Sequence, residues 1–346
     1  MMTKLFSPLS KDGFIPLRNR VVMSAMSRSF ADQDSCATDA MRAYYEKRAA
    51  GGAGLILTEG TIIDKSGDGW VKAPFIANDA QAAAWRPVVD AVHAAGGAIA
   101  CQLWHMGRIS HEDFTGQAPV SSTDKAAAGI NRQNNKPYGV PRALTPEEMP
   151  VIYQQFADAA VRALGAGFDA VELHLANGYL PDQFLDARVN DRTDQYGGSV
   201  ENRCRFVLEL VEAVVKAVPA RQVLARISPS RMMGGLYEWP DLDEMIAYLI
   251  PALDRLGLGA LDVSCANSPY FETSARMVRK IRPLFSGVIL SGASLSAEEA
   301  EAELEAGFID AVTFGRAFIA NPDLAAKLEK GETPVPFEDA MRATLV

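Results

Sequence analysis

Residues 163–174, ALGAGFDAVELH, join a helix-like stretch that stops at glycine to a short apolar run that ends on a polar residue. Glycine at a helix end followed closely by such a run is typical of a helix-to-strand junction. The same pattern recurs at 48–59, 93–104, 255–264 and 303–314. This repetition predicts helices and strands that alternate through most of the chain.

Two further junctions use other helix breakers, at 218–228 (VPARQVLARIS) and 282–291 (RPLFSGVILS), and a strand in NRVVMSA at 19–25 precedes them all. Together they make eight strands, each followed by a helix, which predicts an α/β protein with a (β/α)8 TIM barrel. An open doubly wound sheet also alternates strands with helices and stays the alternative. Because no Gly/Ser/Pro-rich linker interrupts the 346 residues, we expect a single domain over 1–346.

The loops that follow the strands of such a barrel form the face that holds the active site. Two of these loops are long, at about 105–146 and about 175–199. Connections of that length are uncommon unless they are functional, so we expect a capping loop or subdomain at 105–145 over the barrel mouth. At the opposite end, residues 1–18 are expected to form an N-terminal hairpin that closes the barrel floor.

The composition limits the classes of partner. A net charge of −9 at pH 7 would repel nucleic acid and anionic membranes, so we expect neither as a partner. No stretch approaches the roughly 18 unbroken apolar residues of a membrane helix, and the first residues lack the apolar core of a signal peptide. We therefore expect a cytoplasmic protein.

Several common site motifs are missing. No Gly-x-Ser-x-Gly elbow of a serine hydrolase occurs, and the glycine pairs precede strands rather than follow them, which argues against a Rossmann site. The cysteines form no Cys-x-x-Cys pair, so we expect reduced packing residues rather than a zinc, iron-sulfur or disulfide site. The four cysteines are Cys36, Cys101, Cys204 and Cys265.

Three polar residues gather where the fourth strand ends, at His174, Asn177 and Tyr179. The imidazole and the amide can both donate hydrogen bonds to one oxygen and hold an anion that forms there, while a phenol can supply a proton. A structural histidine is the ordinary interpretation of a lone His, and a metal site is weaker because Asn is a poor zinc ligand. Because three polar groups converge, we predict that these residues are catalytic.

Two glycine-containing turns follow the last two strands. Loops at these positions of a barrel commonly bind phosphate through backbone amides and a cation, and an arginine is present. Each glycine alone would indicate only a tight turn, but the pair predicts a phosphorylated ligand. The turns are Ser291, Gly292 and Ala293, and Phe314, Gly315 and Arg316.

Two further polar residues lie on predicted barrel strands, Arg226 at the end of the fifth and Gln102 on the third. Both should face the upper rim of the barrel interior. A buried guanidinium needs a partner or an anionic ligand, so Arg226 either binds a ligand or forms a structural ion pair.

The order of motifs along the chain resembles that of the Old Yellow Enzyme family of FMN-dependent oxidoreductases. The match covers nearly the whole chain, and it is densest in HLANGYLPDQFLDARVNDRTDQYGGSVENRCRF at 174–206. A run of ordered motifs is more specific than any one of them. The other matching segments are LFSPL at 5–9, NRVVMSAMSR at 19–28, TEG at 58–60, QLWHMGR at 102–108 and FGRAFIANPDL at 314–324.

The resemblance implies FMN across the barrel mouth, with its phosphate on the two glycine turns. Ser27 would bond the flavin near its reactive edge, Gln102 would bind the pyrimidine ring, and Arg226 would lie beside N1 and O2, where negative charge collects on reduction. Gly60 would pack and donate beside the ring. The implied cofactor-binding residues are Ala25, Met26, Ser27, Gly60, Gln102, Arg226, Ser291, Gly292, Ala293, Phe314, Gly315 and Arg316.

The resemblance also implies an ene-reductase cycle. NADPH or NADH would reduce FMN and leave, and a small-molecule activated alkene would then take its place, in a ping-pong sequence. His174 and Asn177 would hold the carbonyl or nitro oxygen, Tyr179 would protonate the α-carbon, and Trp104 would shape the substrate pocket. The expected assembly is a monomer or a homodimer.

The sequence leaves other functions open. A nitrate ester or nitroaromatic reductase of the same family would use the same site. A dienoyl-CoA reductase or amine dehydrogenase would need an iron-sulfur cluster, against which the scattered cysteines argue, and a barrel that binds a phosphorylated ligand without redox chemistry is a further alternative.

The chain departs from the family pattern in places that concern flavin and substrate. The family often has Pro and Thr where this chain has Ala25 and Ser27, and a larger residue where it has Ala293. The segment PVPFEDAMRATLV at 334–346 lacks the tyrosine-bearing tail that often walls the pocket. The resemblance therefore gives a reaction class and leaves the substrate open.

Overall fold

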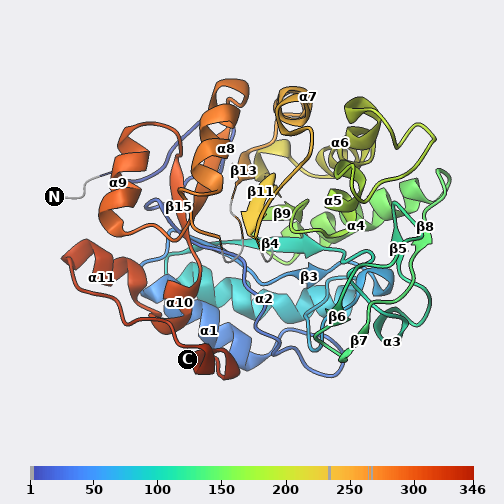
Figure 1. The fold of residues 1–346 in the computed structure, drawn as a ribbon. Coiled ribbons are helices and arrows are strands. Elements are labelled where there is room, and N and C mark those ends of the chain that lie inside the picture. Colours follow the sequence, from blue (N-terminus) through green and yellow to red (C-terminus); the bar gives the residue numbers. More distant parts are fainter. Residues whose placement is uncertain (1–3, 233–234, 264, 266–267) are drawn as a thin grey trace.

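A closed barrel of parallel strands, surrounded by helices, forms the body of the molecule (Figure 1). The computed structural model describes residues 4–232, 235–263, 265 and 268–346. The barrel strands in these residues are β1 (Val21–Met23), β2 (Leu55–Leu57), β4 (Ala98–Trp104), β9 (Ala170–His174), β10 (Val223–Arg226), β13 (Ala260–Asp262), β14 (Val288–Ala293) and β15 (Ala311–Phe314).

The strands pair in the order β2-β1-β15-β14-β13-β10-β9-β4, and β4 pairs again with β2, which closes the ring. This arrangement confirms the predicted (β/α)8 barrel and rules out the open sheet. Strands β4 and β9 end at the predicted residues, Trp104 and His174. The predicted junction 255–264 ends at Ser264, which lies outside the described residues.

Four of the outer helices begin where a short polar side chain accepts from a free backbone N–H group. Thr38, Asn78 and Ser199 each cap a helix in this way, and Ser296 forms a capping box with Glu299. No helix among the described residues is long and apolar enough to cross a membrane. The outer helices are α1 (Asp39–Ala50), α2 (Asp79–Ala94), α4 (Met149–Gly165), α6 (Val200–Ala217), α7 (Leu242–Arg255), α8 (Ser274–Ile281), α9 (Ala297–Glu305), α10 (Arg316–Ala320) and α11 (Leu324–Lys330).

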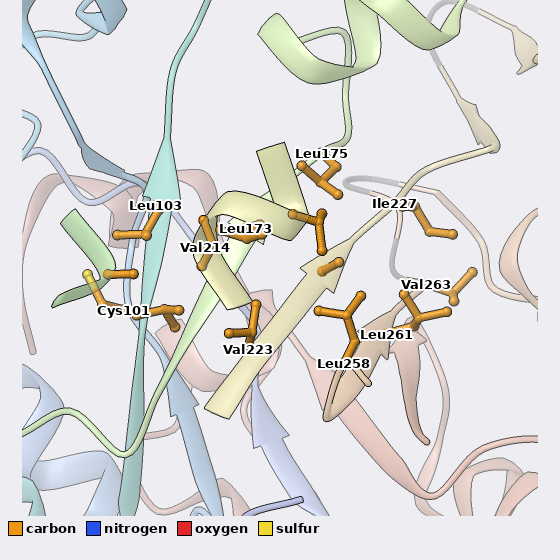
Figure 2. Packing of buried hydrophobic residues seen from close by; sticks show 14 of the residues in the cluster. Cys101, Leu103, Leu173, Leu175, Val214, Val223, Ile227, Leu258, Leu261 and Val263 are labelled. Atoms are coloured by element: carbon orange, nitrogen blue, oxygen red, sulfur yellow. The ribbon is translucent and has the colours of Figure 1, made fainter. Parts of the chain in front are cut away.

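Alternation along the strands separates an outer from an inner apolar cluster. In β4, Cys101 and Leu103 point outward and belong to the large cluster between strands and helices, part of which Figure 2 shows together with Val214 of α6. Ala100 of the same strand belongs to the inner cluster. Because side chains alternate with period two, the next inward residue on β4 is Gln102.

The N-terminal segment lies against the inner cluster. The backbones of Leu9 and Leu17 exchange two hydrogen bonds of 2.9 Å, as in a short antiparallel hairpin. Leu9, Phe14 and Leu17 pack with inward residues such as Val22 and Leu55. These contacts fill the end of the barrel at which the strands begin.

Segments that follow the strands carry short elements of their own. Between β4 and α4 lie α3 (Glu112–Thr115), β5 (Val120–Ser121), β6 (Ile130–Asn131), β7 (Lys136–Pro137) and β8 (Arg142–Ala143). A further strand, β3 (Thr61–Ile62), pairs with β4, and α5 (Leu180–Leu185) follows β9. The hairpin of β11 (Ser230–Met232) and β12 (Leu236–Glu238) after β10 was not predicted, although the sequence contains a Gly-Gly pair between two short runs.

The C-terminal segment returns to the barrel mouth, where η4 (Asp339–Ala343) lies near α10 and α1 (Figure 1). Arg28 donates to the carbonyl of Thr344 at 2.5 Å, and Arg48 donates to that of Val346 at 2.8 Å. These contacts hold the last residues beside the loop that follows β1.

Candidate functional site

Two adjoining cavities open at the ends of the barrel strands, with volumes of about 310 and 290 Å³. Together they reach the size of sites that hold a cofactor. The residues that line both cavities are Ala25, Met26, Arg226 and Arg316. The first is also lined by Ser24, Cys265, Ser268, Pro269, Ser294 and Gly315, and the second by Ser27, Arg28, Trp70, Gln102, Trp104, His174, Asn177, Tyr179, Ile319 and Arg342.

The predicted catalytic residues come together at the second cavity. The rings of His174 and Tyr179 lie 4.9 Å apart between centroids, edge to face. Trp104 contacts Tyr179 in the same manner at 4.9 Å and lies 6.2 Å from His174. The three rings therefore form one packed wall, beside which Asn177 also lines the cavity.

The turn that presents Asn177 is held by buried polar contacts. Asn177 has a left-handed φ of 60°, which asparagine tolerates better than most residues, and Gly178 follows at 81°. The backbone N–H of Asn177 donates to Ser228 Oγ at 2.8 Å, and that of Gly178 donates to Asp182 Oδ2 at 2.7 Å. Arg231 donates to both acceptors, at 3.0 and 2.7 Å. This network links the turn to the β11–β12 hairpin.

Burial fixes the protonation states of the two ring residues. Desolvation, followed by the charge of Arg226, holds the pKa of His174 well below its ordinary value, so the imidazole is neutral at pH 7. Desolvation raises the pKa of Tyr179 to about 12, so its phenol keeps its proton. His174 Nδ1 is buried without a hydrogen-bond partner in the described part of the chain. A neutral imidazole and a protonated phenol are suited to donate to a ligand.

Gly60 is required by the packing of Trp104. A Cβ at Gly60 would lie 2.3 Å from Cε3 of the Trp104 indole, well inside van der Waals contact. The indole has little room to move away, because it packs against the rings of Trp70 and Tyr179, with centroid distances of 5.8 and 4.9 Å. Gly60 therefore supports the aromatic wall from behind.

Polar and charged side chains form the floor of the cavities. Gln102 Nε2 donates to Glu172 Oε2 at 2.6 Å, and Arg226 Nε lies 3.5 Å from Asp262 Oδ2. Both carboxyl groups are fully buried. Arg226 therefore forms the structural ion pair that was one of its two predicted roles. It also lines both cavities, where it can contact a ligand.

A buried carboxyl group shapes the loop that carries Ser27. Glu59 Oε2 accepts from the backbone N–H groups of Arg28 at 2.8 Å and Ser29 at 3.0 Å. Ser29 has a left-handed φ of 67°, and its hydroxyl accepts from Trp70 Nε1 at 2.9 Å. Desolvation raises the pKa of Glu59 to about 7.

The two turns predicted to bind phosphate differ in the space beside their glycines. A Cβ at Gly315 would meet only Met26 Sδ, at 3.6 Å, so open space lies beside this backbone. A Cβ at Gly292 would instead lie 2.4 Å from the Thr313 carbonyl oxygen, so this glycine permits close strand packing. Arg316 lines both cavities next to Gly315.

These residues fit FMN, the group that the resemblance implies. Four arginines line the cavities, and no carboxylate does so among the described residues, which suits a dianionic phosphate. The open space at Gly315 fits a phosphate, and the partnerless His174 Nδ1 leaves a buried hydrogen-bonding atom for a ligand. The arginines are Arg28, Arg226, Arg316 and Arg342.

Some predicted site residues do not line the cavities with their side chains. Ser291 donates its hydroxyl to the Val263 carbonyl, and Phe314 packs in the outer cluster. Gly60 and Gly292 serve packing as described above, and the Ala293 side chain lies outside the described part. Only the backbones of Ser291 and Phe314 remain for contact with a cofactor.

Other residues at the site were missed by the sequence analysis. Glu172 and Asp262 are acidic residues on buried strands, a pattern that could have drawn attention to them. Arg342 reaches the cavity from the C-terminal segment, and no local pattern indicates this. All four cysteines are free, and the described residues contain no cluster of His, Cys, Asp or Glu that could hold a metal ion.

Comparison with known proteins places these features in a family. The model of the NADH:flavin oxidoreductase / NADH oxidase family matches residues 4–334. A relative from Leishmania infantum, described as a probable flavin mononucleotide-dependent alkene reductase, is 38% identical over 325 residues, which cover 91% of this chain and 88% of that protein.

Solved structures agree with this match. An Old Yellow Enzyme homologue from Zymomonas mobilis aligns with a TM-score of 0.91 at 34% identity, over 99% of this chain and 97% of that one. Morphinone reductase in complex with tetrahydroNAD aligns with a TM-score of 0.89 at 40% identity, over 98% and 94% of the two chains. The chain therefore belongs to the NADH:flavin oxidoreductase / NADH oxidase family, as an FMN-dependent oxidoreductase of the Old Yellow Enzyme group.

Proposed function

We propose that this enzyme is an ene-reductase that reduces the C=C bond of small α,β-unsaturated carbonyl or nitro compounds with NADPH or NADH as the reductant. The observation that carries the proposal is the convergence of His174, Asn177 and Tyr179 on one cavity. FMN, when bound, would supply the hydride that reaches the β-carbon. The two cavities adjoin at one end of the barrel, so the reductant and the alkene would occupy the same place in turn, which supports a ping-pong cycle.

His174 and Asn177 would bind the oxygen of the substrate. The imidazole is neutral, so it donates one hydrogen bond without adding a full positive charge. Two donors at one oxygen stabilise the negative charge that develops there during reduction. The left-handed turn at Asn177, held by Ser228, orients the second donor.

Tyr179 would donate the proton to the α-carbon. Its phenol keeps its proton at neutral pH because burial raises its pKa to about 12. The edge-to-face contacts with His174 and Trp104 restrict its ring. A positioned acid in a cavity shielded by aromatic side chains can act in place of water.

The cofactor would lie on the floor and the rim of the cavities. Gln102 and Arg226 would face the flavin ring, Ser27 its edge, and Gly315 with Arg316 its phosphate. These roles are supported by the lining of the cavities and by the open space beside Gly315.

We further propose that the whole chain acts as one FMN-binding domain in which residues 105–145 cap the mouth. Gln183 supports this role, because it joins the cap to the catalytic turn. Its Nε2 donates to the carbonyls of Met106 at 3.1 Å and Gly178 at 2.8 Å. Its Oε1 accepts from Arg108 N at 3.1 Å and Ser121 Oγ at 2.9 Å.

Anaerobic stopped-flow spectroscopy of a Tyr179→Phe variant tests the proposal. Reoxidation of the reduced flavin by 2-cyclohexenone should slow by about 10²- to 10⁴-fold, the usual contribution of a general acid. Reduction by the nicotinamide should stay nearly unchanged, since it needs no proton from Tyr179. Equal losses in both half-reactions would contradict the assignment.

A matched control is Tyr138→Phe. Tyr138 is the other tyrosine that contributes to the raised pKa of Tyr179, and it lies in the capping segment. If Tyr179 is the donor, loss of the Tyr138 hydroxyl should leave both half-reactions near the wild-type rates.

A further inference from the structure

Two carboxyl groups lie together in the barrel interior, and the mechanism above uses neither. Glu172 on β9 and Asp262 on β13 are both fully buried, on strands that flank β10. Arg226, the cation of the floor, lies on β10 with its Nε 3.5 Å from Asp262 Oδ2. Two acids thus face one guanidinium beneath the cavities.

The hydrogen bonds of Glu172 fit a protonated acid. Its Oε2 accepts from Gln102 Nε2 at 2.6 Å, while its Oε1 is buried without a hydrogen-bond partner in the part that the structure describes. Desolvation and then the charge of Asp262 raise the pKa of Glu172, against the opposing charge of Arg226. The side chains of Glu172 and Asp262 interact directly, and both are fully buried. Two interacting carboxylates in such a site cannot both ionise readily, so one proton belongs to the pair.

Polar groups face Glu172 from both strands that pair with β9 and from β13, the strand beyond β10. Gln102 faces it from β4, Arg226 from β10 and Asp262 from β13. On its own strand the next inward residue is His174, which is neutral. With one proton on the acid pair, the single negative charge balances Arg226.

We propose that Glu172 and Asp262 share one proton beneath the cavity floor and act through Arg226 as positioning residues that set the charge facing the FMN ring. The proposal rests on the proposed function, since it assumes that Arg226 lies against the flavin. Neither acid lines the cavities, so their effect is transmitted by the guanidinium and by Gln102.

The charge of this pair should affect flavin reduction. Negative charge collects at the N1 and O2 edge of reduced flavin, beside which Arg226 would lie. When the pair loses its proton at high pH, the floor gains one negative charge, which opposes that accumulation. The reduction potential should therefore fall more steeply with pH while the proton is lost.

Spectroelectrochemistry of the FMN-loaded protein across neutral pH tests this effect with Glu172→Gln. The amide is neutral at every pH, so the variant should match the wild type at low pH and stay above it at high pH. The expected difference is about tenfold in the ratio of reduced to oxidised flavin, or about 30 mV for a two-electron couple. Identical curves for the two proteins would overturn the proposal.

Two further variants define the origin of the effect. Asp262→Asn removes the competing charge, so Glu172 should ionise at lower pH. The pH range in which the reduction potential falls steeply should therefore also move to lower pH. Glu303→Gln is a control, because Glu303 is a buried acid that pairs with Arg279 away from the floor. A pH dependence altered equally by Glu303→Gln would overturn the assignment to the floor.

Infrared spectroscopy of the flavin-free protein tests the shared proton independently. A buried protonated carboxyl gives a carbonyl band that shifts in D2O. The wild type should show contributions from Glu172 and Glu59, and Glu172→Gln should lose the Glu172 contribution and keep that of Glu59. An unchanged band in the variant would overturn the proposal. A protein that binds no flavin but loses the Glu172 contribution in Glu172→Gln would refute the proposed function and support the shared proton.

Discussion

A Gly60→Ala substitution should damage the site through Trp104. The new Cβ would lie 2.3, 2.7 and 3.0 Å from three indole carbons of Trp104. Because carbon atoms pack at roughly 3.5 Å or more, the indole must move by about 1 Å. Trp104 has little room for this shift, because it is 2% exposed and its indole packs against the ring of Tyr179.

The cost should appear in both stability and catalysis. Overpacking of this kind lowers the free energy of unfolding by about 1–3 kcal/mol. A displacement of about 1 Å at a catalytic group can reduce the rate by about 10²-fold, and we expect that loss in flavin reoxidation by the alkene. Chemical denaturation and anaerobic stopped-flow measure the two effects.

Gly165→Ala is the matched control. Gly165 ends α4, is exposed, and has no atom within 4 Å of the position that a Cβ would take. This change should leave catalysis intact and stabilise the protein slightly, since alanine favours helix by up to about 1 kcal/mol. A Gly60→Ala enzyme with wild-type stability and wild-type reoxidation would refute the steric argument.

Two further predictions concern buried charge. Asp182→Asn removes the buried carboxylate that pairs with Arg231 and should lower the free energy of unfolding by about 3–5 kcal/mol, whereas Asp243→Asn, in an exposed pair, should change it by less than about 1 kcal/mol. Equal losses in urea denaturation would argue against this. Glu59 has a pKa of about 7, above its ordinary value of 4.5. The native state then binds more protons between these values, so stability falls as pH rises through that window, and Glu59→Gln should remove up to about 3 kcal/mol of that fall. Denaturation at several pH values measures it, and parallel pH profiles for the two proteins would count against it.

The sequence predicted the architecture well because its signals are local. Glycines that stop helices mark the starts of strands, and the ends of β4 at Trp104 and β9 at His174 follow from them. Parallel strands in a barrel bring their carboxyl ends to one rim. Residues as distant in sequence as Ser27 and Arg316 therefore line the same cavity.

The features that escaped prediction depend on contacts between distant segments. The Glu172 and Asp262 carboxyls meet only because β9 and β13 both flank β10. Side-chain direction also misled the interpretation of Ser291, whose hydroxyl serves the neighbouring strand rather than the cavity. The approach of Arg342 depends on how the C-terminal segment packs on Arg28.

The half-reactions of the purified, FMN-loaded protein without oxygen test the central claim most directly. NADPH or NADH should bleach the flavin absorbance, and 2-cyclohexenone should then restore it while the saturated ketone forms. A bleached protein whose colour does not return with any enone or nitroalkene would contradict the assignment as an ene-reductase.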